Sequence, residues 1–323
     1  MAATVGGDVS PQAIDERFTL KTASLLRAVL LDSVQQVIAS DPVAIPILQR
    51  FTGVRVQDRP TVVLPDALAD HAQGCGGGSE HHTAAALTCG LQLDLLTGAY
   101  THIDLADGRA ADQRLPLNHA PVPPGTVRLA DLGFLDLKVL AALDADGAYF
   151  LLKLPSAITL TDDPARAPEA LLRFVRRLGP VAQEALVLAK IRWQIELIFK
   201  LWKSHGLVDE WRTANPFRIL CEVYAKLVGM VFHHWCFLVG CWIYPDRSLV
   251  KAAQVVRDHA LILALACGCR RQLLMLSTVA SAAEPEPPRA SSCGYSSPVA
   301  GSCERRPTHS APVDPSGSPS PAQ

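Results

Sequence analysis

The sequence lacks several patterns that would assign a secreted or redox-active protein. It contains no Cys-x-x-Cys pair, and its 9 cysteines are an odd number with no paired spacing. No basic segment followed by an apolar run opens the chain, so a secretory signal peptide is not expected. Together these absences predict a protein of the reduced cytoplasm.

An excess of charge of one sign is also missing. The chain has 30 Lys and Arg against 31 Asp and Glu, which argues against a histone-like or polybasic protein. The balance is uneven, however, because residues 1–180 hold 15 basic against 20 acidic residues, whereas 181–260 hold 10 against 7. Binding to an anion such as DNA is therefore expected to be local, and 181–260 is the segment where we expect it.

The hydrophobic runs are too short or too interrupted for a clear membrane span. Residues 227–243 are the nearest candidate, with no Asp, Glu, Lys or Arg over a length at the lower limit for a span. His233 and His234 lie at the centre of this run. We predict a buried helix with packed histidines and no membrane association, since one His pair supplies too few ligands for a metal site.

The alternation of apolar and polar residues predicts an α/β protein. Helical patterns fill the N-terminal region 1–50, and later helices make the C-terminal half of the folded part helical. Strand patterns interleave with a helix between them, which predicts a mixed sheet. The expected strands are 54–58, 61–64, 90–96, 99–106, 126–131 and 148–154; the expected helices include 22–40, 43–50, 136–145, 181–204 and 215–243.

Composition changes sharply near the C-terminus. Nine of the 24 prolines fall within 281–323, among Ser, Ala and Gly. Such a segment cannot bury enough apolar surface to order itself, so 267–323 is predicted to be a disordered tail. The expected organisation is a helical region at 1–50, a folded domain at 51–266 and this tail.

Three carboxylates stand where they could converge. Asp58 ends the strand VRVQD, Asp131 ends the strand VRLAD, and Glu196 lies on a helix beside Arg192 and Lys203. Converging carboxylates repel each other unless a cation lies between them, and Mg²⁺ prefers such oxygen ligands. Two simpler interpretations remain open from the residues alone: a strand-end Asp that forms a turn, and a solvated ion pair between Arg192 and Glu196.

The segment RWQIELIFKLWKSHG, with Arg192-x3-Glu196-x6-Lys203, resembles the C-terminal signature of DDE-class transposases of bacterial insertion sequences, the insertion sequence four family. The resemblance covers most of residues 9–266 and implies a ribonuclease H-like fold. It also implies that Asp58, Asp131 and Glu196 hold two Mg²⁺ ions, or Mn²⁺.

The same resemblance implies a reaction and its partners. Water would attack at the transposon end, and the freed 3′-hydroxyl would attack target DNA. Arg192, Lys203 and Lys200 would bind phosphates of double-stranded DNA. A homodimer would join two transposon ends in a synaptic complex.

The chain departs from the family pattern at three places. Ala189 stands where relatives have Tyr, Arg59-Pro60 follows the first Asp, and the interval from Asp131 to Glu196 is short because an insertion at about 155–180 is reduced. An alternative therefore stays open at the level of sequence. The chain would then be a catalytically dead, DNA-binding remnant that inhibits intact relatives or has no function, possessing the fold but not the enzyme activity.

Overall fold

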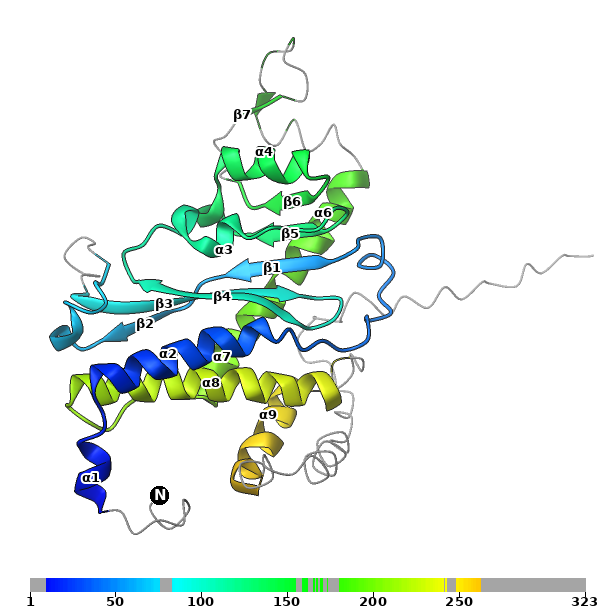
Figure 1. Ribbon diagram of the computed structural model, residues 1–323. Helices are drawn as coiled ribbons and strands as arrows, with labels where there is room; N and C mark the ends of the chain where they lie inside the picture. The colour runs from blue at the N-terminus through cyan, green and yellow to red at the C-terminus, as the bar shows by residue number, and fades with distance from the viewer. Residues whose placement is uncertain are drawn as a thin grey trace, which may run out of the picture. The chain divides into compact units, whose positions relative to one another are not determined.

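The computed structural model describes residues 10–75, 83–154, 180–240, 242 and 248–262, together with 159–161, 165, 167, 169, 170 and 173. Most of these residues form a six-stranded mixed sheet with helices packed against it (Figure 1). The predicted α/β class and the mixed sheet are confirmed. The predicted tail, 267–323, and most of 155–180 lie outside the described residues.

The sheet strands run across the molecule in the order β4-β3-β1-β5-β6, with β2 beside β3 on the same side as β1. The two pairings of β5, with β1 and with β6, are parallel, and the pairings of β3 are antiparallel. The bounds are β1 Val54–Asp58, β2 Thr61–Leu64, β3 Ala85–Asp94, β4 Tyr100–Asp107, β5 Val127–Ala130 and β6 Tyr149–Leu152; a separate pair consists of β7 Thr159–Leu160 and β8 Glu169–Ala170.

Strands β1 and β2 pair with β3 in one shared register. Asp58 lies opposite Leu91 and Thr61 lies opposite Thr88, so the two strands are parts of one antiparallel ladder. The interruption falls at Arg59-Pro60, where proline cannot donate a ladder hydrogen bond. The ladder continues across it because the amide of Cys89 donates to the carbonyl of Pro60 at 3.1 Å. The carboxylate of Asp58 is thereby placed beside a break in a strand whose register is fixed on both sides.

The helices cover the two faces of the sheet unequally. α2 and α8 lie side by side, and α2 also contacts β4 while α7 contacts β1 (Figure 1). On the other face lie the shorter α3 and α4. The helix bounds are α1 Pro11–Asp15, α2 Leu20–Gln35, α3 Pro116–His119, α4 Leu137–Ala145, α6 Pro180–Ile191, α7 Trp193–Ser204, α8 Pro216–Gly240 and α9 Leu249–Asp258; short 3₁₀ turns are η2 Asp66–Leu68, η3 Asp112–Arg114 and η4 Leu132–Phe134.

The main core lies between the sheet and the first group of helices. Val56 of β1, Leu91 of β3 and Leu129 of β5 are almost fully buried there, together with Ile195 of α7 and Leu227 of α8. Burying a side chain of this size contributes about 1.5–3 kcal/mol relative to leaving it in water. Because α2 belongs to this same core, the predicted helical region 1–50 packs directly on the sheet domain.

Three helix predictions need correction, and the first is the helix expected over 22–40, which ends at Gln35. No helix forms over 43–50, because Pro46 lacks the amide hydrogen that a helix needs and disfavours helical geometry at Ile45. Residues 46–50 form turns instead. The helix predicted over 181–204 is divided at Arg192 into α6 and α7, where the amide of Ile195 bonds to the Arg192 carbonyl three residues back, as in a 3₁₀ turn.

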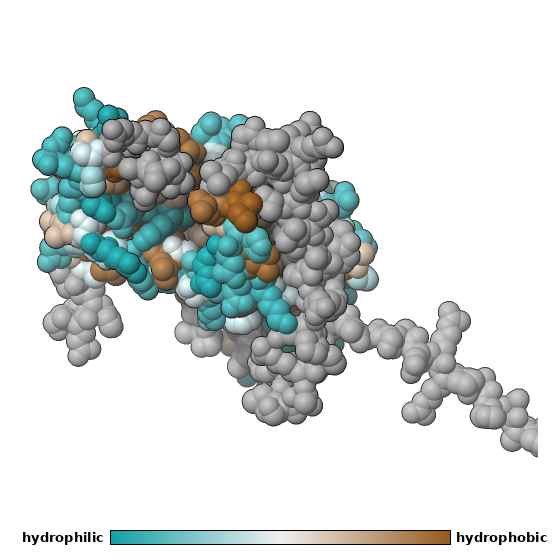
Figure 2. Space-filling view, turned by 90° about the horizontal axis from the view of Figure 1, so that it is seen from below, coloured by the Kyte–Doolittle hydropathy of each residue, from teal (hydrophilic) through white to brown (hydrophobic). Residues whose placement is uncertain are grey.

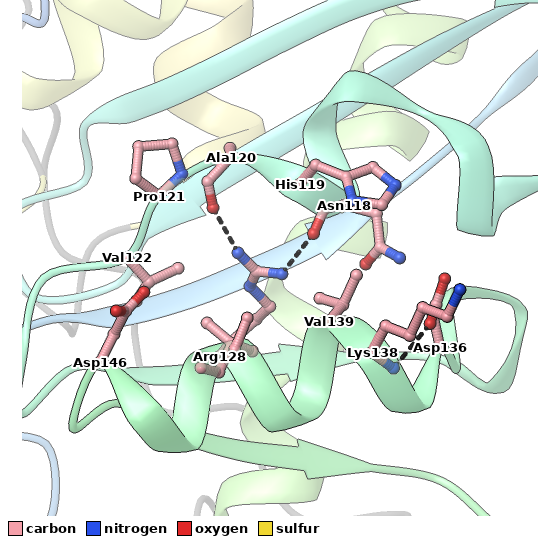
Figure 3. A pocket seen from close by; sticks show the side chains of 12 residues that line it. Asn118, His119, Ala120, Pro121, Val122, Arg128, Asp136, Lys138, Val139 and Asp146 are labelled. Atoms are coloured by element: carbon pink, nitrogen blue, oxygen red, sulfur yellow. Dashed lines mark hydrogen bonds between the residues drawn. The ribbon is translucent and has the colours of Figure 1, made fainter.

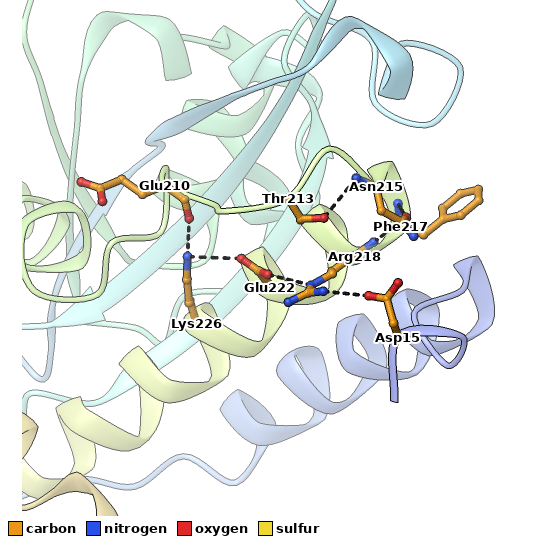
Figure 4. A network of polar contacts seen from close by, with 8 residues as sticks. All are labelled: Asp15, Glu210, Thr213, Asn215, Phe217, Arg218, Glu222 and Lys226. Atoms are coloured by element: carbon orange, nitrogen blue, oxygen red, sulfur yellow. Dashed lines mark hydrogen bonds and ion pairs between the residues drawn. The ribbon is translucent and has the colours of Figure 1, made fainter. Parts of the chain in front are cut away.

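The N-terminal helix α1 is attached to α8 by ionic contacts (Figure 4). Arg218 Nη1 lies 2.7 Å from Asp15 Oδ1, and the same guanidinium lies over the Phe18 ring. Arg218 also reaches Glu222, which is 4.0 Å from Lys226. The Asn215 side chain caps the start of α8 by accepting from the amides two and three residues on. This network fixes the first turn of α8 against the N-terminal segment.

Several large hydrophobic side chains are exposed on the outer surface. Seen from below, hydrophilic residues predominate and the hydrophobic areas are separate (Figure 2). Leu25 on α2, at 62% exposure, and Leu261, at 60%, are among the exposed apolar residues. Leu261 is followed by the exposed Ile262, and exposed apolar residues of this kind are common on folded proteins.

Residues 227–240 of the apolar run predicted as a buried helix form the second half of α8. Among the described residues no helix is long and apolar enough to cross a membrane. His233 and His234 are both buried, as predicted; His234 Nε2 lies 2.6 Å from the Gly98 carbonyl oxygen, and its ring stacks on Tyr100. Gly98 has φ +69, and a Cβ there would lie 2.3 Å from Leu238 Cδ2, so this turn needs glycine for close contact with α8.

The burial of His234 predicts a pH-dependent stability. Burial lowers the pKa of His234 to about 4, below the ordinary value of 6.5. Between these values the unfolded chain binds the proton and the folded chain does not. The free energy of unfolding should therefore fall as pH drops from 6.5 towards 4, by about 3 kcal/mol at most.

This dependence can be measured by urea unfolding at pH 7.5, 6, 5 and 4.5. The variant His234→Gln keeps an amide donor for Gly98 and should show a shallower fall. Burial also lowers the pKa of His233, so some dependence remains. An equally steep fall in the variant would contradict the assignment to His234.

Candidate active site

Asp58 occupies the end of β1 and is partly buried. Its Oδ1 accepts from the Arg59 amide at 2.8 Å, and its Oδ2 lies 3.4 Å from Arg192 Nη1. Burial raises the pKa of Asp58, while the Arg59 amide and the Arg192 charge lower it. The negative charges of Glu196 and then Asp131 raise it further. The charges of both other predicted site carboxylates therefore act on Asp58.

Asp131 follows β5 and reaches this region because of strand pairing. β1 and β5 are parallel, with Val56 opposite Leu129, so their carboxyl ends meet at one edge of the sheet. Asp131 caps the turn η4 through a 2.8 Å bond from the Leu132 amide to Oδ1. The strand-end turn interpretation is thus correct for this Asp, and it is compatible with a second role because Oδ2 takes no part in that bond.

Glu196 comes from α7, far from Asp58 in sequence. Its Oε1 lies 2.8 Å from Arg192 Nη2, one helical turn earlier. The guanidinium of Arg192 thus joins Glu196 to Asp58, with all three side chains between 20% and 34% exposed. Partly exposed pairs of this kind contribute about 0.2–1 kcal/mol each. The predicted ion pair between Arg192 and Glu196 exists, but it is part of a three-residue contact across two elements.

Lys200 and Lys203 extend this surface along α7. Both are exposed, and their spacing from Glu196 puts them on the same side of the helix. Lys200 Nζ lies 4.7 Å from the centre of the exposed Trp193 ring. The lysines therefore continue a positive surface away from the carboxylates.

Arg59 does not crowd the carboxylates. Its Nε lies 2.7 Å from Asp112 Oδ1, and Nη1 donates to the carbonyl of Ala110. The guanidinium is thus held by the segment before α3. The sequence shows that Arg59 follows Asp58 but cannot show this direction, because Asp112 is distant in the chain.

The arrangement is not a preformed metal centre. In the described part of the chain, no three His, Cys, Asp or Glu side chains are grouped closely enough to hold a metal ion. One cation, the Arg192 guanidinium, already contacts an oxygen of Asp58 and one of Glu196.

The sequence contains a further polar pattern in the two strands that precede the candidate site. The two strands that end in the candidate aspartates both have an arginine as their second residue, Arg55 in VRVQD and Arg128 in VRLAD. The register pairs these two arginines, and alternation points them to the face opposite Asp58. Arg128 is almost fully buried, at 3% exposure.

Comparison with known families identifies the fold's relatives. A family model described as "Transposase DDE domain" matches residues 51–230, more than half of the chain. The chain belongs to the DDE transposases of bacterial insertion sequences. The match begins where the predicted catalytic domain begins and includes Asp58, Asp131 and Glu196.

Individual transposases are similar over most of their length. The transposase for insertion sequence element IS231F of Bacillus thuringiensis subsp. israelensis is 21% identical over 81% of this chain and 74% of its own length. The IS231E transposase of B. thuringiensis subsp. finitimus is 19% identical over 81% and 73%. The IS1151 transposase of Clostridium perfringens is 26% identical over 74% and 67%.

These alignments bear on the length of this transposase. The alignment with the IS231F relative spans 360 positions, more than the 323 residues of the whole chain. The relatives therefore have residues inside the aligned region that this chain lacks. This agrees in direction with a reduced insertion.

Proposed function

We propose that the chain cleaves the ends of its insertion sequence and joins them to target DNA, with Asp58, Asp131 and Glu196 as the catalytic carboxylates. The observation that carries the proposal is the contact of Asp58 and Glu196 through Arg192, since 134 positions separate Asp58 from Arg192 in the sequence. The charge of Asp131 acts on the same Asp58.

The strand order supports a ribonuclease H-like fold. Three antiparallel strands, β4, β3 and β1, are followed across the sheet by the parallel strands β5 and β6. We propose this fold, and membership in the insertion sequence four group, as the finer description of the family. The cytoplasmic location, the two-ion stoichiometry and the homodimeric synaptic complex also remain predictions.

The carboxylates fit a divalent cation by their chemistry. Asp58, Asp131 and Glu196 offer the oxygen ligands that Mg²⁺ or Mn²⁺ prefers. Burial is the main cause of the raised pKa of Asp58, and the negative charges of Glu196 and Asp131 add to it. Repulsion between such carboxylates is the kind that a cation relieves. When bound, such an ion would activate a water molecule for attack on a phosphodiester. Arg192 would have to release Asp58 and Glu196 to leave their oxygens available.

The basic residues would then position the DNA. A guanidinium released from the carboxylates can bind a phosphate with two parallel hydrogen bonds. Lys200 and Lys203 lie on the same side of α7 and would bind flanking phosphates as point charges. Ala189 offers no hydroxyl for this task, so the proposed contacts fall to these three basic side chains.

The test is cleavage of duplex DNA carrying the element's own terminal repeats. We expect cleavage in Mg²⁺ or Mn²⁺ and none in EDTA, and DNA binding whose log K falls linearly with log salt. Salt-sensitive binding without any cleavage would instead support the inhibitory remnant. If the chain shows no DNA binding and no cleavage, both functions are refuted.

A further inference from the structure

A cavity of about 320 Å³ lies on the face of the sheet opposite Asp58, between α4 and the segment that follows α3 (Figure 3). Its walls are largely apolar and include Val122, Val139 and Leu143, with Arg128 among the lining residues. The volume is at the lower end of the range for small-molecule sites, which is about 300–1,000 Å³.

Arg128 is the buried polar group of this cavity. Its two terminal nitrogens donate to the carbonyls of Asn118 and Ala120, both at 2.7 Å. Its Nε is buried and has no hydrogen-bond acceptor among the described residues. Figure 3 shows the guanidinium between the post-α3 segment and α4, where the cavity lies.

The charge of Arg128 is poorly compensated. Burial and the neighbouring charge of Arg55 lower the pKa of Arg128 to about 10, so it stays protonated at neutral pH. Arg55 itself bonds to Gln92 and to the Pro121 carbonyl, and its Nε is also buried without an acceptor in the described residues. A buried charge without a counter-ion is costly, so a bound anion would be stabilising here.

Helix capping explains part of this arrangement. The carbonyls of Asn118 and Ala120 belong to the C-terminal end of α3, and a cation there is favourable. Capping accounts for the two terminal nitrogens. It does not account for the unbonded Nε, the second arginine beside it or the open cavity next to a buried cation.

We propose that this cavity binds a small oxyanion, a phosphate group, with Arg128 as its principal ligand. Asp136 and Asp146 also line the cavity and disfavour a long polyanion, while Lys138 adds a second positive charge to the lining. The phosphate would come from a free nucleotide-sized molecule or from the terminal phosphate of a strand. The site lies on the other face from the catalytic carboxylates and does not depend on the proposed cleavage.

The probe is inorganic phosphate, titrated to 20 mM against the full chain with ionic strength held constant by chloride. For a dissociation constant of about 1 mM, 20 mM phosphate should raise the folding equilibrium constant about 20-fold. Arg128→Met should lose this response. The Arg128→Met variant is less stable in any case, because it loses two hydrogen bonds to carbonyls. The readout is therefore the gain in stability when phosphate is added.

A second variant keeps the test decisive if Arg128→Met does not fold. Ala142→Phe places a ring at a position that lines the cavity, leaves Arg128 and its carbonyl bonds intact, and should also lose the response. Lys21→Ala removes an exposed cation on α2 and should respond like the native chain, which controls for general salt effects. The proposal is overturned if phosphate stabilises the native chain no more than it stabilises a folded cavity variant.

The source of the phosphate is separated with two further ligands. A short single-stranded oligonucleotide with a 5′-phosphate is compared with the same strand ending in a 5′-hydroxyl, and a nucleoside monophosphate is titrated alone. Arg128-dependent stabilisation by the phosphorylated strand only would assign a strand end. Stabilisation by the monophosphate as well would assign a small molecule, and stabilisation by neither would contradict the site.

Discussion

Glu196→Gln should lower DNA cleavage by at least about 100-fold while leaving DNA binding within about threefold of the native value. The amide keeps the size of the side chain and removes the negative charge that a divalent ion would require. The loss of the contact with Arg192 should cost less than about 1 kcal/mol of stability, because the pair is partly exposed. Cleavage of a labelled terminal-repeat duplex, followed by gel electrophoresis, measures the first effect.

The matched control is Glu210→Gln. Glu210 is also a glutamate of this region, but it is exposed and its contact with Lys226 uses the backbone carbonyl. Cleavage should be unchanged in this variant. If both substitutions reduce cleavage alike, or neither does, Glu196 has no special role and the assignment of Asp58 and Asp131 loses its support as well.

Arg192→Ala should have opposite effects on two kinds of binding. Removing the guanidinium frees an oxygen of Asp58 and one of Glu196, so the affinity for Mn²⁺ should rise on the order of tenfold, about 1.4 kcal/mol. DNA binding should weaken, and the slope of log K against log salt should fall by about 1. Calorimetric titration with Mn²⁺ and DNA binding at several salt concentrations measure these effects without relying on turnover.

Arg192→Lys is the informative partner variant. Lysine keeps the charge but cannot reach two carboxylates with a planar fork, so Mn²⁺ affinity should lie between those of the native and alanine forms. Mn²⁺ binding that is lost in Glu196→Gln but unchanged in Arg192→Ala would leave the metal site intact and reject the competition. No Mn²⁺ binding in any form would reject the metal site itself.

The sequence predicts the strands because local patterns specify them, whereas the family resemblance selects Asp58, Asp131 and Glu196 as candidate site residues. VRVQD and VRLAD alternate with period 2, and their parallel pairing brings Asp58 and Asp131 to one edge. The helix carrying Glu196 has a clear apolar stripe that packs on β1. What local patterns miss depends on distant partners: Arg192 reaches across to Asp58, and Arg59 turns to Asp112.

Local patterns also fail where one residue changes the backbone. The apolar spacing of 43–50 suggests a helix, yet Pro46 removes a hydrogen bond from it. The helix over 181–204 has good spacing throughout, but a tight turn at Arg192 divides it. The cavity beside Arg128 could not be predicted, because its walls come from segments that meet only in the folded chain.

The shared register of β1 and β2 limits which changes this gene can tolerate. Side chains in a strand alternate between faces, so a one-residue deletion or insertion at Arg59-Pro60 would put one of the two strands out of register with β3. If β2 kept its pairing, Asp58 would turn away from Glu196 and towards the buried face of Arg55. Substitutions in this link can be neutral, but a change of its length by one codon would be expected to disrupt the proposed site even though none of its candidate residues is lost.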